Sequence, residues 1–159
     1  MTNTLIVTTP SECEIVITRV FNAPRNLVFD CWTKPELLRR WMLGPEGWTF
    51  SLCEIDLQVG GKYRFVWRSS EGNEMGMGGV YREIMPPERI ADTQLFDEDW
   101  TGGETAGTLV FTEHGGKTTT TNTIRYSSTV ARDAALTTGM AQGLGMGYDR
   151  LDTYLASIA

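Results

Sequence analysis

The sequence has little of what would point directly to a chemistry. It contains one histidine in 159 residues, and this residue, His114, precedes two glycines in an expected hairpin turn. Without a second histidine, a histidine-based zinc site and a histidine-relayed nucleophile are both disfavoured. The chain also has no nucleophile elbow, no P-loop and no dinucleotide-binding glycine motif ahead of a helix. No cofactor and no metal are expected, and no catalytic residue is assigned.

Positive charge is scarce as well. The chain has 14 Lys and Arg against 20 Asp and Glu, a net charge of -6. Phosphate backbones and anionic bilayers are bound by clustered cations, so neither a nucleic acid nor a membrane is an expected partner. No stretch approaches the ~18 apolar residues of a membrane span, and the N-terminal residues do not resemble a signal peptide. The expected location is cytoplasmic.

Cysteine is rare, odd in number and without a C-x-x-C spacing. Each of the three lies in an apolar stretch, where a free thiol behaves as a small buried hydrophobe. We therefore expect free thiols in a reducing compartment rather than disulfides. They are Cys13, Cys31 and Cys53.

Alternation of apolar and polar residues predicts seven strands, most of them joined by tight turns. Consecutive strands with such short connections form an antiparallel meander. The whole chain, 1–159, is expected to form one domain, with residues 1–11 mobile. The predicted strands are 12–21, 48–58, 62–68, 75–84, 89–96, 106–113 and 118–126.

Two short helices are predicted between the first two strands, and a long one at the C-terminus. Asn22 can cap the first helix, and Thr33 with Glu36 has the spacing of a capping box for the second. After the hydroxyls of residues 127–129, one continuous helix of about 40 Å is expected. Its apolar stripe comprises Val130, Met140, Leu144, Tyr148, Leu151 and Leu155.

This order of elements predicts an α+β fold. A curved antiparallel sheet of about six to seven strands would be crossed on its concave face by the C-terminal helix. A twisted sheet that only one helix covers leaves a cavity, and aromatic, methionine and glycine side chains are the candidates to line it. These candidates are Trp41, Tyr63, Phe65, Trp67, Met77, Tyr81, Phe96, Phe111, Met140, Gly143, Leu144 and Gly147.

Glycines recur every fourth residue of the C-terminal helix, at Gly139, Gly143 and Gly147. An interior glycine costs a helix about 0.5–1 kcal/mol relative to alanine, so the stripe calls for an explanation. Close contact of the helix with the sheet is one interpretation. The other is that the missing side chains leave volume for a ligand.

Carboxylate groups occur in two places that could support acid–base chemistry. Asp97, Glu98 and Asp99 lie in a polar loop that ends at Trp100, which is typical of a solvated rim. Glu54 and Asp56 share one side of a predicted strand, and its alternation favours their facing water. If that side faced the cavity instead, burial would raise the pKa of one of them and make it a candidate base.

Family-specific motifs are distributed along the chain, at 21–24, 32–41, 44–47, 56–65, 79–84, 87–90, 131–133 and 139–155. Together they resemble the Aha1-type family, which is named for an activator of the Hsp90 ATPase. The resemblance covers nearly the whole chain and implies the helix-grip fold of the START/Bet v1 superfamily, whose cavity binds lipids, polyketides and similar molecules. No shared catalytic motif maps onto this sequence. Family members often have an aromatic residue in the final helix, where this chain has Leu144 among glycines.

Three functions follow as hypotheses. The favoured one is non-catalytic binding of an apolar or lipid-like small molecule for transport, sensing or sequestration. The resemblance implies an alternative, a module that binds an Hsp90-type chaperone and stimulates its ATPase. A second alternative is an enzyme similar to polyketide cyclases or hydrolases, which requires a buried ionisable residue in the cavity such as Glu54, Asp56 or Arg125. The oligomeric state is left open.

Overall fold

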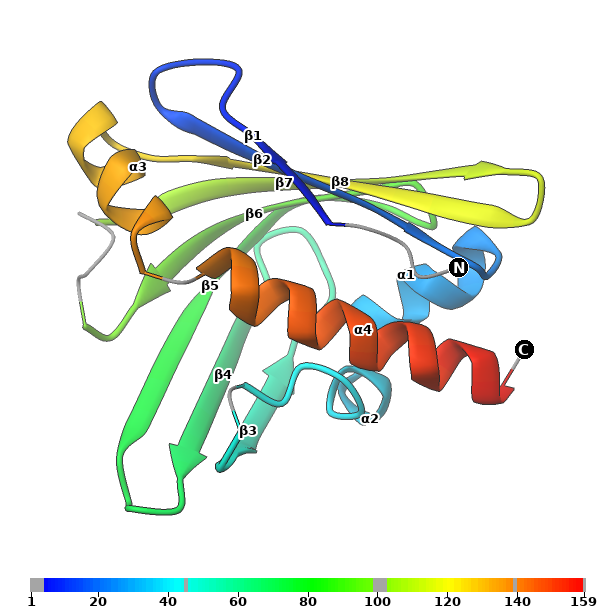
Figure 1. Cartoon of the computed structure of the whole chain (residues 1–159), viewed down its shortest axis with the longest axis horizontal. Helices are drawn as coiled ribbons and strands as arrows, with labels where there is room; N and C mark the ends of the chain where they lie inside the picture. The colour runs from blue at the N-terminus through cyan, green and yellow to red at the C-terminus, as the bar shows by residue number, and fades with distance from the viewer. Residues whose placement is uncertain (1–4, 45, 99–102, 139, 159) are drawn as a thin grey trace.

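The computed structural model describes residues 5–44, 46–98, 103–138 and 140–158. An eight-stranded antiparallel sheet curves around the long C-terminal helix, which lies across its concave side (Figure 1). The strands are β1 (Ile6–Thr8), β2 (Glu14–Phe21), β3 (Trp48–Ile55), β4 (Lys62–Ser69), β5 (Glu74–Met85), β6 (Arg89–Phe96), β7 (Thr105–His114) and β8 (Lys117–Arg125). The helices are α1 (Arg25–Thr33), α2 (Pro35–Leu38), α3 (Thr129–Leu136) and α4 (Met140–Ile158).

The strand order is β1-β2-β8-β7-β6-β5-β4-β3. From β3 to β8 neighbours in the sheet are neighbours in sequence, as the tight turns predicted. The connection from β2 to β3 contains α1 and α2. It runs from β2, next to the edge strand β1, to β3 at the opposite edge of the sheet. The predicted α+β helix-grip architecture with two short helices after the first long strand is confirmed.

The sheet has eight strands rather than six to seven because residues before Glu12 also pair. Ile6–Thr8 forms an edge strand whose register runs from Ile6 opposite Thr18 to Thr8 opposite Val16. Three residues are too few to show a period of two, and Ile6 is 55% exposed. The sequence pattern therefore carried no signal for β1.

The C-terminal segment is two helices, so the prediction of one continuous helix is wrong. α3 ends at Leu136 and α4 begins at Met140. The hydroxyls of Thr137 and Thr138 donate to the carbonyl oxygens of Ala134 and Ala135, at 2.8 and 2.6 Å. Such local hydrogen bonds compete with helix continuation. As a consequence Val130 does not extend the buried stripe of α4 and is 79% exposed.

The helix caps differ in part from the prediction. Ser128 caps α3, because its side chain accepts a hydrogen bond from the Ala131 amide. Neither Asn22 nor Thr33 caps a helix: Pro24 and Lys34 occupy the N-cap positions of α1 and α2 without a side-chain hydrogen bond. α1 continues through Thr33, whose hydroxyl donates to the Phe29 carbonyl at 3.0 Å, and this excludes the capping box.

An ion pair fixes α4 to the sheet. Arg19 lies on the inward side of β2, next to Ile17 and Phe21, and is 2% exposed. Its guanidinium contacts the carboxylates of Asp149 and Asp152 on α4 at 2.9 and 2.7 Å. A buried guanidinium needs such partners, since an unpaired charge is expensive to bury. The pair fixes where α4 crosses the concave face.

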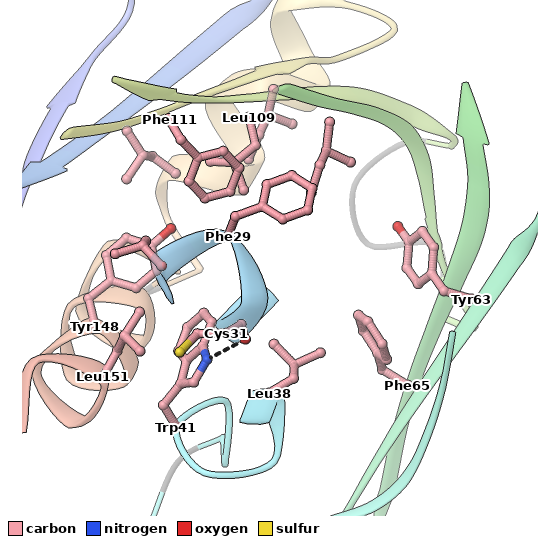
Figure 2. Packing of buried hydrophobic residues seen from close by; sticks show 14 of the residues in the cluster. Phe29, Cys31, Leu38, Trp41, Tyr63, Phe65, Leu109, Phe111, Tyr148 and Leu151 are labelled. Carbon is pink, nitrogen blue, oxygen red and sulfur yellow. Dashed lines mark hydrogen bonds between the residues drawn. The ribbon is translucent and has the colours of Figure 1, made fainter. Parts of the chain in front are cut away.

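The core fills the part of the concave face that α1 and α2 cover. Trp41 is 1% exposed and donates from Nε1 to the Cys31 carbonyl at 2.9 Å (Figure 2). Tyr148 of α4 contacts the rings of Phe21, Trp32 and Trp41 edge-on or tilted. In the described ranges, no helix is both long and apolar enough to cross a membrane.

Candidate functional site

A cavity of about 650 Å³ lies between the sheet and α4. β4 to β8 form its wall, the segment after α2 closes one side, and α4 lies over it. Pockets that hold small molecules usually span ~300–1,000 Å³. Of the residues predicted to line it, all but one do so: Trp41, Tyr63, Phe65, Trp67, Met77, Tyr81, Phe96, Met140, Gly143, Leu144 and Gly147.

Phe111 is the exception. It is 1% exposed and makes edge-to-face contacts with Phe29 and Trp32 of α1, at centroid distances of 5.3 and 5.7 Å. Figure 2 shows its ring directed toward Phe29. Phe111 faces the interior, as the residues of the cavity wall do. α1 covers that part of β7, however, so Phe111 belongs to the core and not to the cavity wall.

Aromatic residues of β4 form one wall of the cavity. Tyr63, Phe65 and Trp67 alternate with outward-facing residues, and adjacent rings lie 4.9 and 6.1 Å apart between centroids. Figure 2 shows Tyr63 and Phe65 directed from β4 into the interior, toward Leu38 and Phe29. The Tyr63 hydroxyl donates to the Thr93 carbonyl at 2.8 Å, and Trp67 Nε1 donates to the Met42 carbonyl at 2.9 Å. These hydrogen bonds hold the rings in place, so the wall is preformed.

The segment after α2 forms the side of the cavity next to α4. Met42, Leu43 and Gly44 all line it. Arg150 of α4 donates to the Gly44 carbonyl at 3.0 Å, which ties this segment to the helix. Gly44 has a φ of +79°, a conformation in which a side chain would be strained.

The glycines of α4 have different surroundings. A Cβ built at Gly143 would meet no atom within 4 Å, so this exposed lining position opens onto free space at the cavity mouth. A Cβ at Gly147 would touch the Trp41 backbone oxygen and ring at 3.7–3.9 Å, which is ordinary packing. Gly147 therefore fits the close-contact interpretation and Gly143 fits the interpretation of spare volume. Gly139 lies outside the described residues.

The sequence interpretation missed several residues of the cavity wall, and the acidic one among them is Asp92. It stands opposite Tyr81 of β5 and opposite Gly107 of β7 in the two ladders of β6. With Ile90, Gln94 and Phe96 it lines the cavity. The signal was in the sequence: within β6 these residues alternate, so Asp92 shares a face with apolar residues.

Burial raises the pKa of the Asp92 carboxyl from 3.8 to about 7, although hydrogen bonds with Tyr63 and Gln94 act in the opposite direction. Removing a carboxylate from water penalises its charged form, and no nearby cation compensates. Among the described residues, no lysine, arginine or histidine forms an ion pair with Asp92. The cavity therefore holds a carboxyl group that changes protonation near neutral pH.

The ionisable residues considered from the sequence lie elsewhere. Glu54, Asp56 and Arg125 are all exposed. Asp97 and Glu98 are also exposed, as expected for a solvated rim, and Asp97 forms a two-point ion pair with Arg64. Asp99 and Trp100 lie outside the described residues.

The three cysteines are free. Burial is the main reason that the pKa values of Cys31 and Cys53 are raised to about 11, and Cys13 is half-buried. His114 is exposed and precedes Gly115 and Gly116, which turn the chain between β7 and β8 with φ of +59° and +77°.

Comparison with known proteins agrees with this architecture. A family model described as activator of Hsp90 ATPase homolog 1-like protein matches residues 22–156. A crystal structure of a protein from Rhodobacter sphaeroides is 31% identical, with a TM-score of 0.91, covering 96% of this chain and 98% of that one. Protein Ms6760 from Mycobacterium smegmatis is 22% identical (TM-score 0.85, 99% and 100% covered). An AHSA1-like protein from Aeromonas hydrophila is 18% identical (TM-score 0.72, 89% and 93% covered). No curated protein matches the chain.

Proposed function

This chain belongs to the activator of Hsp90 ATPase homolog 1-like family, and we propose that it binds an apolar or amphipathic small molecule between the sheet and α4. The observation that carries the proposal is the preformed cavity of about 650 Å³, walled by aromatic and methionine side chains. Burying apolar ligand surface against such a wall stabilises the complex by about 25 cal/mol per Å².

Access to the cavity supports the same proposal. Gly143 has no side chain at the cavity mouth, where a Cβ would meet open space. Methionines from separate elements, Met75 and Met77 on β5 and Met140 on α4, line the interior. Methionine side chains adapt to irregular ligand shapes, which suits a site for more than one apolar molecule.

The test is a titration with N-phenyl-1-naphthylamine, an uncharged apolar dye whose fluorescence rises when it leaves water. We expect saturable binding by the wild-type protein and displacement of the dye by 1-decanol. Gly143→Leu should abolish or strongly weaken dye binding without unfolding the protein. Gln142→Leu is the matched control, because it adds the same side chain at an exposed neighbouring position that does not line the cavity.

If Gly143→Leu folds correctly and binds the dye as tightly as the wild type, ligands do not enter the cavity past residue 143. An absence of saturable dye binding by the wild-type protein would contradict the proposal itself. Global unfolding of Gly143→Leu alone would return this glycine to the close-packing interpretation.

Asp92 supports a second candidate, an enzyme that transfers a proton to or from a substrate in the cavity. A carboxyl group with a pKa near 7 in an apolar cavity meets the requirement for an acid–base group. Hydrolysis of 4-nitrophenyl decanoate tests it: turnover should rise with pH through about 7 and be lost in Asp92→Asn. Equal turnover by both proteins would exclude this candidate.

The chaperone-binding alternative rests on the family's name. It predicts that the purified protein stimulates the ATPase of an Hsp90-type chaperone from the same cell. No stimulation together with no binding would remove it.

A further inference from the structure

The carboxyl group of Asp92 is an acidic feature in the described lining of the cavity, and packing does not explain it. An apolar residue at this position of the concave face would make the folded protein more stable. The carboxylate therefore calls for a functional explanation. The site is also shaped to hold it. A Cβ on Gly107, the residue opposite in β7, would lie 2.7 Å from Asp92 Oδ1 and 2.9 Å from Gln94 Nε2. A side chain at 107 would therefore displace the carboxylate.

Hydrogen-bond acceptors are in excess at this place. The Tyr63 hydroxyl has a single proton, which the Thr93 carbonyl, at 2.8 Å, and the Asp92 carboxylate must share. An ionised carboxylate can accept about four hydrogen bonds, and Gln94 and Tyr63 together supply at most two of them. A ligand that satisfies the Asp92 carboxylate must therefore supply hydrogen-bond donors. A ligand that is also positively charged offsets the free-energy cost of holding this anion away from water.

The neighbouring rings favour the same kind of ligand group. Tyr81 stands directly opposite Asp92 in the ladder between β5 and β6, and the Tyr63 ring lies 5.3 Å from the Tyr81 ring. The faces of aromatic rings attract cations. The chain as a whole carries a net charge of -6, which also attracts cationic ligands.

We propose that the cavity selects apolar molecules that carry one protonated amine, with the ammonium group bound at Asp92 beside Tyr63 and Tyr81. This inference rests on the proposed function and specifies its ligand class. The apolar part of the ligand would occupy the space along Phe65, Met77 and Leu144.

The groups around Asp92 make the binding depend on pH in a defined direction. Tyr63 and Tyr81 face it from β4 and β5, and Tyr126, Tyr148 and Arg150 also line the cavity. Burial raises the pKa values of the four tyrosines, so they stay neutral below pH 8. Among the described residues that line the cavity, Asp92 is the one with a carboxyl group, and it must be ionised to pair with an ammonium group.

The experiment is calorimetric titration with three probes of equal chain length: decylamine, 1-decanol and decanoate. At about pH 8 an alkylamine is protonated and Asp92 is ionised. Hydrogen bonds to charged groups contribute ~1.5–3 kcal/mol, so decylamine should bind roughly 10–100-fold more tightly than decanol. Decanoate should bind most weakly. Asp92→Asn should abolish the preference for the amine, and Glu54→Gln, which removes an exposed carboxylate from β3, should retain it.

A second measurement uses the unmodified protein. The ratio of decylamine to decanol affinity should fall as pH decreases from about 8 to about 5.5, because Asp92 takes up a proton while the amine keeps its own. Equal binding of amine and alcohol, tightest binding of decanoate, a preference that survives in Asp92→Asn or a ratio independent of pH would each overturn the inference and leave the proposed function intact. If neither the decyl probes nor the apolar dye bind, the proposed function fails with it.

Discussion

Gly107 lies directly opposite Asp92 in the ladder between β6 and β7, and its missing side chain leaves the space that the carboxylate occupies. The two residues together place an acidic group on an otherwise apolar concave face. A strand glycine normally weakens a sheet, since it adds no packing. Here its missing side chain leaves room for the ends of the Asp92 and Gln94 side chains, and this connects the sequence of β7 to the chemistry of the cavity.

The first prediction concerns stability against pH in Asp92→Asn. The pKa of Asp92 is raised on folding from 3.8 to about 7, so between these values the folded protein holds a proton that the unfolded chain has released. The wild type should therefore lose stability as pH rises through this window, by an amount on the order of 1–4 kcal/mol. The free energy of unfolding of Asp92→Asn should not fall in this way. In urea unfolding the variant should therefore be more stable relative to the wild type at about pH 8 than at about pH 4.

Asp97→Asn is the control of opposite sign. The hydrogen bonds from Arg64 lower the pKa of Asp97, so this carboxylate contributes stability at neutral pH that is lost as pH falls. Its replacement should cost stability at neutral pH and little under acid conditions. A stability difference between Asp92→Asn and the wild type that does not change with pH would show that Asp92 is not desolvated as described.

The second prediction concerns the attachment of α4. Both Asp149 and Asp152 contact Arg19, but the Asp149 side chain is 61% exposed and that of Asp152 is 22% exposed. Asp152→Asn should therefore destabilise by about 1–3 kcal/mol, because it leaves a buried guanidinium with a single solvated partner. Asp149→Asn should cost less than about 1 kcal/mol, as surface pairs do. Equal losses in denaturant unfolding would contradict the assignment of Asp152 as the main partner.

The third prediction concerns the thiols. Burial keeps Cys31 and Cys53 protonated, with pKa values of about 11, whereas Cys13 is half-buried. Because the thiolate is the reactive form, Cys13 should react first with a thiol reagent under native conditions. Cys13→Ser should remove this fast phase, and denaturation should release the other two. Three thiols reacting at one rate in the folded protein would be inconsistent with the burial of Cys31 and Cys53.

Strand alternation predicted most of the fold and the aromatic residues of β4 in the cavity wall, because a period of two fixes which side chains share one face of the sheet. The period says nothing about which part of an inward face another element covers. Phe111 shows this limit: it faces inward like Phe65, yet Phe29 and Trp32 pack on it. Only the three-dimensional course of α1 separates core from cavity here.

Two further features of the structure are not predicted by the sequence pattern, each for a local reason. The helical period continues across residues 137 and 138, so the pattern predicted one helix where two threonine hydroxyls bind back to the preceding turn. Asp92 has no other acidic residue within three positions in the sequence, so it does not stand out as a carboxylate pair or cluster. A single carboxylate in register with Ile90 and Phe96 was the relevant signal, since it interrupts an inward apolar face.

Methionine methyl groups offer the most direct test of the proposed binding cavity. Met42, Met75, Met77 and Met140 line the cavity, whereas Met85 and Met146 are exposed and do not line it. In a titration of methyl-labelled protein with 1-decanol, followed by NMR, the four lining methyl groups should shift together to saturation while Met85 and Met146 stay unchanged. Shifts confined to Met85 and Met146, or no saturable shift at any methionine, would contradict ligand binding between the sheet and α4.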